Sequence, residues 1–277
     1  MLKYLIMKNL IFIFCSFALL FTSCQKEEDN SPQNQEKPAQ EDLTMKIHIY
    51  PATAQVVTNA LSDIDGNVYD AVQMGEQLWM AENLRSTRYA DGTEIPMGDS
   101  TFFGVPYRYL PNGAESNVST CGYLYNYAAA IGTNANAGGT AGVQGVCPDG
   151  WHVPSDAEWT QLTDYVSSQS DFVMGNDAQN IAKAMASTTG WKPSGNAYAV
   201  GNDASLNNAT GFSTLAAGGF YNNVYTYFNY TANFWTSTEV NATSAWIRSL
   251  YYGNAKVLRF GYSGNKSGAY SVRCLQD

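Results

Sequence analysis

The spacing of apolar and polar positions predicts a domain built mostly from antiparallel strands. From Gly211 to the end of the chain, short β-type runs are separated by Gly and Asn, which is typical of strands joined by turns. These runs are GFSTLAAGGF, YTYF, FWTSTE, SAWIRSLYY, KVLRFGY and SVRC. A turn over Tyr251–Ala255 separates the fourth and fifth of them. No motif occurs twice, so one domain explains the length after residue 60.

The N-terminal half carries the same kind of signal. Residues 62–84 predict a turn at Asp65 and Gly66 followed by a hairpin, in which Gly75 separates Val68–Val72 from the apolar segment through Met80. Residues 46–50 alternate like a short edge strand. The acidic and amide positions of this turn resemble the start of a calcium loop, but the Gly and Glu that such a loop needs are replaced by Val68 and Met74. Turn formation by Asp63, Asp65 and Asn67 is therefore the favoured interpretation.

Two helices are predicted in the middle of the chain. Ser155 and Glu158 have the spacing of a capping box, in which each side chain accepts a hydrogen bond from a free backbone N–H. One apolar face then follows, made of Trp159, Leu162 and Val166. A second helix is expected over Ala178–Ala186, ending near Gly190. Strands plus two helices and long loops give an α+β fold class.

The N-terminus has the layout of an export signal. Two lysines precede the apolar run Leu10–Phe21, which ends in small residues and Cys24 and is short for a membrane-spanning helix. This ending resembles a bacterial lipobox, so residues 1–23 are expected to be a lipoprotein signal peptide, with Cys24 acylated and held in membrane lipid. The acidic run after Cys24 resembles a tag for the outer cell face, although a solvated charge run has the same composition.

Residues 24–60 are expected to form an acidic tether that includes the possible edge strand. Residues 25–42 are rich in Gln, Glu, Asn and Pro and show no apolar periodicity, which is the composition of a disordered linker.

Charge excludes some partners. Removing Lys3 and Lys8 with the signal from 15 basic side chains leaves 13 against 24 acidic ones, a net charge of −11. Because nucleic acid binding depends on clustered Lys and Arg, no nucleic acid partner is expected. The charged fraction is only 14%, against about 25% in ordinary domains, and Tyr, Gly, Asn, Ser and Thr make up the difference. Such neutral polar surfaces bind through stacking and hydrogen bonds.

The cysteine count predicts one disulfide. Cys15 leaves with the signal and Cys24 takes lipid, so Cys121, Cys147 and Cys274 remain in an oxidising compartment. The residues alone do not decide which two of them pair.

Eight blocks occur along the chain in an order that one family shares. They are DIDGNVYDAVQMGEQLWMAENL, YADGTEIP, GYLYNYAAA, GVCPDGWHVPSDAEW, GFSTLAAGGF, FWTSTE, AW and YSVRC. They resemble the Fibrobacter succinogenes major paralogous domain (FISUMP) family. The resemblance covers residues 61–277. It implies a secreted or lipid-anchored bacterial surface domain of unsettled function, with a fold similar to C-type lectin-like domains and formylglycine-generating enzymes. It favours pairing of Cys147 with Cys274, while Cys121 with Cys147 remains the competing pair.

No catalytic site is expected. His48 lies in the predicted edge strand, and His152 precedes a predicted helix, where a structural role is favoured. The sequence does not contain the ligand spacing of a zinc site. Glu239 and Asn241 are the nearest candidates for a calcium site, but two residues are few for the cluster that calcium needs. Cys121 and Cys274 invite comparison with the reactive cysteines of the formylglycine-generating relatives, but structural cysteines are the commoner case in exported domains. The chain is therefore expected to be neither an enzyme nor a cofactor or metal protein.

Large aromatic and basic side chains are assigned to packing, and loop tyrosines to binding. The expected core anchors are Trp151, Trp159, Trp235 and Trp246, and the expected structural arginines are Arg248, Arg259 and Arg273. The candidate ligand-binding residues lie near predicted turns: Tyr221, Asn222, Tyr225, Tyr251, Tyr252, Asn254 and Tyr262, with Asn223 and Asn265 nearby.

These features predict a surface-exposed bacterial lipoprotein of the cell outer membrane, facing the exterior, whose domain is a binding or adhesion module for glycan or protein ligands. Two alternatives stay open. One is a degenerate relative of formylglycine-generating oxidases, and the other is a structural component of the cell envelope.

Overall fold

The computed structural model describes residues 55–102, 104–132, 142–261 and 264–277. Cys24, the tether up to residue 54, the predicted edge strand at 46–50 and Tyr262 therefore lie outside the described residues. The predicted hairpin is confirmed, since residues 71–74 pair antiparallel with residues 77–80 across Gly75. A second hairpin precedes it, in which residues 56–62 pair antiparallel with residues 68–72 across the turn at Asp65 and Gly66. The sheet begins at Val56, ahead of the expected domain start at residue 61.

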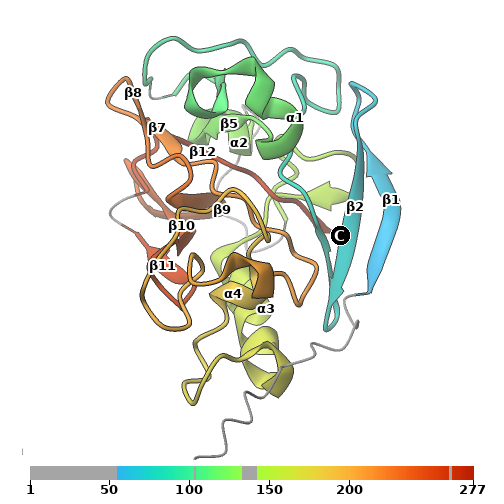
Figure 1. The fold of residues 1–277 in the computed structure, drawn as a ribbon. Helices are drawn as coiled ribbons and strands as arrows, with labels where there is room; N and C mark the ends of the chain where they lie inside the picture. Colours follow the sequence, from blue (N-terminus) through green and yellow to red (C-terminus); the bar gives the residue numbers. More distant parts are fainter. Residues whose placement is uncertain (1–54, 103, 133–141, 262–263) are drawn as a thin grey trace, which may run out of the picture. The chain divides into compact units, whose positions relative to one another are not determined.

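The first sheet joins both ends of the described chain (Figure 1). Its strand order is β1-β2-β3-β13-β6, so a strand at the C-terminus lies between strands from the first half. The strands are β1 (Val56–Ser62), β2 (Val68–Met74), β3 (Gln77–Met80), β13 (Leu275–Gln276) and β6 (Trp151–His152). Every pairing between them is antiparallel.

Two more sheets complete the fold. One is three-stranded in the order β11-β10-β9, and the other is five-stranded in the order β4-β5-β12-β7-β8. The three-stranded sheet comprises β9 (Thr231–Asn241), β10 (Ser244–Tyr251) and β11 (Leu258–Phe260). The other comprises β4 (Arg108–Tyr109), β5 (Leu124–Asn126), β7 (Gly219–Tyr221), β8 (Val224–Thr226) and β12 (Ala269–Tyr270). The named strands pair antiparallel throughout, as predicted.

The first predicted helix is confirmed. It is α3 (Asp156–Ser168), and both bonds of its capping box form: the backbone N–H of Ser155 donates to Glu158, and the backbone N–H of Glu158 donates to the Ser155 hydroxyl. Trp159, Leu162 and Val166 are buried on its inner face. The short helices elsewhere are α1 (Val118–Cys121) and α2 (Tyr127–Ile131), with 3-10 turns at Pro111–Gly113, Glu115–Asn117, Ser170–Phe172 and Ala204–Leu206.

The second predicted helix is wrong in its extent. Only α4 (Ala182–Met185) is helical, a single turn. The preceding residues form a turn instead, because Asp177 accepts the backbone N–H groups of Gln179 and Asn180 and draws the chain away from helical bonding. Asp and Asn favour such local bonds over helix continuation.

The run GFSTLAAGGF was predicted as one strand, but only its end belongs to β7. Its central residues lie beside the end of α4. The backbone N–H of Thr214 donates to the Met185 carbonyl, and the Thr214 carbonyl accepts a hydrogen bond from the backbone N–H of Ser187. The last run, SVRC, was also predicted as a strand, but residues 271–274 lie between β12 and β13 and belong to neither. The backbone carbonyl groups of Val272 and Cys274 accept bonds from the segment that follows β3 and from β3 itself.

The core lies between α3 and the sheets. Trp159 of α3 is fully buried and its ring contacts those of Trp79 on β3, Phe234 on β9 and Phe212. Trp79 and Phe212 are also in contact with each other. The structure is thus an α+β fold made mostly of antiparallel sheets, with one helix longer than two turns among the described residues.

Candidate functional site

The candidate tyrosines and asparagines divide between two turns. Tyr221, Asn222 and Tyr225 belong to the β7–β8 hairpin, where Tyr221 is exposed and Tyr225 packs against Phe220 with ring centroids 4.7 Å apart. Asn222 and Asn223 form the hairpin turn with φ of 51° and 62°. Asn tolerates this left-handed conformation better than other non-glycine residues, so both asparagines shape the turn. Asn223 also accepts two bonds from Thr101.

The other candidates lie at the β10–β11 turn. The rings of Tyr251 and Tyr252 meet at 4.6 Å. Asn254 accepts the backbone N–H of Lys256, while its own backbone N–H donates to Tyr251, so this asparagine also holds a turn. Asn265 does the same for the turn at Ser267. Among the described candidates, the β10–β11 turn is thus where two candidate tyrosines are in ring contact with each other.

Sequence reasoning missed three neighbours of these tyrosines. Tyr230 packs on Tyr252 at 5.2 Å, and Lys192 donates to the Tyr230 hydroxyl at 2.7 Å while its ammonium lies 4.6 Å from the ring centroid. Tyr227 is 64% exposed. We call Lys192, Tyr227, Tyr230, Tyr251 and Tyr252 the tyrosine surface. The closely spaced tyrosines of YTYFNY indicate such a surface, but the segment YTYF was interpreted only as a strand.

The electrostatics of this surface follow from its contacts. The pKa of Tyr251 is raised by its hydrogen bond to Tyr252, by burial and by the nearby Tyr230 and Tyr227. The pKa of Lys192 is raised by its bond to Tyr230. Both raised pKa values keep the Tyr251 phenol neutral and the Lys192 ammonium charged at neutral pH.

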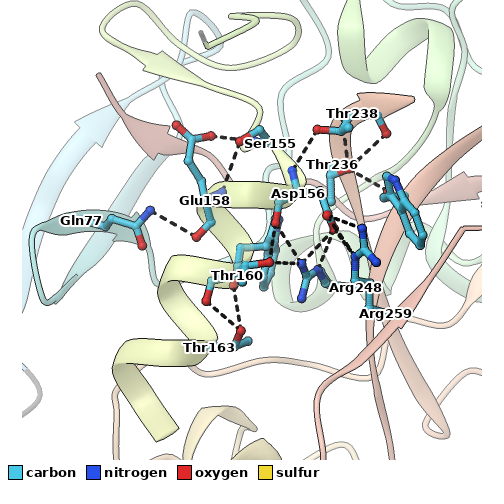
Figure 2. Close-up of polar contacts among 12 residues, drawn as sticks. Gln77, Ser155, Asp156, Glu158, Thr160, Thr163, Thr236, Thr238, Arg248 and Arg259 are labelled. Carbon is cyan, nitrogen blue, oxygen red and sulfur yellow. Dashed lines mark hydrogen bonds and ion pairs between the residues drawn. The ribbon is translucent and has the colours of Figure 1, made fainter. Parts of the chain in front are cut away.

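A second cluster fixes α3 against the three-stranded sheet (Figure 2). Asp156, at the first position of α3, accepts bonds from Arg248 of β10 at 2.8 Å and from Arg259 of β11 at 2.8 Å. Its backbone N–H donates to Thr238 of β9, and Arg248 also donates to the hydroxyl of Thr160. Arg248 is almost fully buried and Arg259 is 45% exposed. The structural role predicted for these arginines is confirmed.

The third arginine is also structural. Arg273 is fully buried, and its guanidinium donates to the amide oxygen of Asn83 and to the backbone carbonyl groups of Phe212 and Ser213.

Trp246 corrects one packing expectation. Trp151, Trp159 and Trp235 are buried as predicted, but Trp246 is only partly buried, and the Arg259 guanidinium lies over its ring at 3.4 Å from the centroid. A long side chain covers the ring here in place of a second apolar layer.

The turn interpretation of Asp63 is confirmed. Its carboxylate accepts four bonds, from the backbone N–H groups of Asp65 and Asn67, the Asn67 amide and the Tyr69 hydroxyl. Glu239 pairs with Lys266 at 2.7 Å, and the Asn241 side chain accepts from Thr243. Within the described part of the chain, no three His, Cys, Asp or Glu side chains are arranged to hold a metal ion.

The disulfide joins Cys147 and Cys274, which confirms the favoured pairing and rules out Cys121 with Cys147. Cys121 is a buried free thiol whose pKa burial raises to about 11. It stays protonated at neutral pH, a state in which a cysteine is a poor nucleophile. No helix among the described residues has the length and apolar character needed to cross a membrane.

The comparisons with known proteins identify a family. The model of the Fibrobacter succinogenes major domain matches residues 72–276. No curated protein and no solved structure matches the chain. The match begins within β2 and ends with β13, so it leaves out β1 but includes strands of all three sheets, α3 and both disulfide cysteines. The chain belongs to the Fibrobacter succinogenes major domain family.

Proposed function

We propose that this chain is a lipoprotein of the bacterial outer membrane, anchored through Cys24 and exposed to the exterior, whose domain binds glycan or protein ligands. The export layout, the cysteine after small residues and the acidic tether support the anchor and the location. The low charge and the many tyrosines support a binding surface of neutral polar groups. We further expect that the fold is related to C-type lectin-like domains.

The tyrosine surface is the observation that carries the binding proposal. Tyr227 is 64% exposed and has a φ of 58°, a backbone conformation that is unfavourable for an aromatic residue. Tyr230 and Thr231 both donate their backbone N–H groups to the Tyr227 carbonyl and hold it there. A conformation of this kind persists only where the surroundings enforce it, and such positions cluster at binding sites. Tyrosine also gives a large contact area at a low cost in rotamer entropy.

The state of the cysteines fits a non-enzymatic role better than the oxidase alternative. Two of the three cysteines after Cys24 form the disulfide, and Cys121 is buried and protonated. A cysteine-based oxidation needs an accessible thiolate, which neither the bonded pair nor Cys121 provides. The remaining alternative, an envelope component that binds neighbouring lipoproteins, predicts a protein ligand on the same surface.

The test is a glycan array together with a pull-down from host and envelope protein extracts, both with the full chain. We expect saturable binding that falls about tenfold or more in a Tyr251→Ala, Tyr252→Ala double variant, because interface tyrosines are often hot spots. Phe102→Ala is the matched control, since Phe102 is another half-exposed aromatic and lies outside the tyrosine surface. Binding that is unaffected by the double variant, or no saturable binding in either assay, would refute the proposal.

A further inference from the structure

A hollow of about 240 Å³ lies between three segments that are far apart in the sequence. Its walls come from the turn at 62–64, from residues 86–90 and from the loop 146–149 beside the disulfide. The volume is below the roughly 300–1,000 Å³ of pockets for drug-sized ligands, so it suits one ring-sized unit of a ligand. It does not include any residue of the tyrosine surface.

The walls are fixed before a ligand arrives. The 62–67 turn is held by the four bonds to Asp63. Asp65 ties this turn to the next segment, because it accepts from both the backbone and the hydroxyl of Thr87. The third wall is anchored by the disulfide at Cys147. A preformed pocket avoids the ordering cost that a flexible loop would bring to binding.

Arg88 supplies unused donors to the hollow. Its side chain is 53% exposed, and its only ion pair among the described residues is a long one, 3.9 Å from Nε to the Asp65 carboxylate. No hydrogen bond of its guanidinium occurs within that part of the chain. Across the hollow, one oxygen of Asp149 accepts from Gln144, which leaves the other as an acceptor. Donors and acceptors on facing walls suit adjacent hydroxyl groups of one ligand.

The other part of the lining is apolar. Ile64 is 47% exposed although it is a large aliphatic residue, and Val146 and Pro148 lie on the opposite segment. A ligand that has C–H surface on one side and hydroxyl groups at its edges matches both parts of the lining, since the apolar contact contributes through burial and the polar edge through hydrogen bonds.

The charges of the hollow argue against a charged ligand. Asp63 and Asp149 in its lining repel anions, and the guanidinium of Arg88 repels cations. From this juxtaposition we infer that the Arg88 hollow binds one residue of a neutral sugar chain. The inference rests on the proposed function as a binding module, and it assigns a glycan subsite at a place separate from the tyrosine surface.

The experiment measures binding of a panel of neutral oligosaccharides, namely maltohexaose, cellohexaose, xylohexaose and mannohexaose, to the full chain by calorimetry. We expect at least one to bind, and we expect Arg88→Ala to weaken that binding by about tenfold or more because charged hydrogen bonds are among the strong ones. Ser62→Trp, a substitution at an exposed residue of the lining, should block the hollow and abolish binding. Thermal unfolding of each variant checks that the fold is retained.

The outcomes separate this inference from the proposed function. Loss of sugar binding in Arg88→Ala and in Ser62→Trp, with little change between about 0.05 and 0.5 M salt, supports a neutral sugar subsite. Binding that is lost only in the Tyr251→Ala, Tyr252→Ala double variant overturns the inference and leaves the proposed function standing. Sugar binding that Arg88→Ala and Ser62→Trp both leave unchanged overturns it as well, as does a panel in which no sugar binds.

Discussion

His152 shows how a single side chain joins distant parts of the chain. Its two ring nitrogens contact Asp277 at 2.7 Å and Glu158 at 3.0 Å, which ties the last residue of the chain to the first turn of α3. Burial on its own lowers the pKa of His152, but the hydrogen bonds and charges of Glu158 and Asp277 outweigh it, and the net pKa is raised above 6.5. The pKa of Glu158 is lowered in turn: burial opposes this, and the bonds to His152 and Ser155 outweigh it.

This raised pKa predicts a pH-dependent stability. A group whose pKa is higher in the folded state stabilises the fold fully below its unfolded pKa of about 6.5, and this contribution is lost as the pH rises through the folded value. We expect the free energy of unfolding to differ more between wild type and His152→Gln at about pH 5.5 than at about pH 8.5. Urea unfolding at both pH values measures the two differences. Equal differences would show that the ion pairs of His152 contribute nothing.

The docking of α3 belongs to the scale of elements. The carboxylate of Asp156 forms ion pairs with two guanidinium groups from neighbouring strands (Figure 2). The two arginines differ in exposure, so they are expected to contribute differently to stability. The Arg248 side chain is 5% exposed, so Arg248 and Asp156 form a pair largely out of water. Arg259 keeps contact with solvent, which screens its attraction to Asp156.

Two substitutions at the same carboxylate therefore have unequal effects. Arg248→Ala should lower the free energy of unfolding by about 3–5 kcal/mol, because it leaves Asp156 without its buried partner. Arg259→Ala should cost about 1 kcal/mol or less, as exposed ion pairs and exposed cation–π contacts do. Urea denaturation of the two variants tests the ranking, and each serves as the other's control. A larger loss in Arg259→Ala would contradict this account of the cluster.

The elements also differ in how well local sequence specifies them. The capping box of Ser155 and Glu158 acts within four residues, so the start of α3 could be predicted from the sequence. The apolar spacing at Ala178–Ala186 also resembled a helix, but bonds from Asp177 and from residues 208–214 redirected that segment. Contacts with sequence-distant backbone override a weak local preference.

At the scale of the whole molecule, the disulfide and the first sheet bring the ends of the domain together. Cys147 and Cys274 are 127 positions apart, and β13 inserts between β3 and β6 in the same region. The Arg88 hollow exists only because of this closure, since its third wall is the loop that carries Cys147.

The anchor proposed at Cys24 makes a prediction about the whole chain. In the native bacterium, the wild-type protein should incorporate labelled palmitate and fractionate with the outer membrane, because acyl chains supply membrane affinity. Cys24→Ser should lose both properties, whereas Cys121→Ser, a change at a cysteine inside the domain, should keep them. Labelled or membrane-bound Cys24→Ser protein would contradict an anchor at this position.

The sequence by itself determined the features that depend on neighbouring residues: the family, the antiparallel hairpins, the capped start of α3 and the turn chemistry of Asp63. Tertiary structure decided the features that join residues from separate segments of the chain. It placed Tyr230 and Lys192 beside Tyr252, set Trp246 at the surface under Arg259, and built the Arg88 hollow from three loops. Residue type and spacing report local backbone preference, while a surface or a hollow depends on which distant segments pack together, and that is fixed by burial of the whole core.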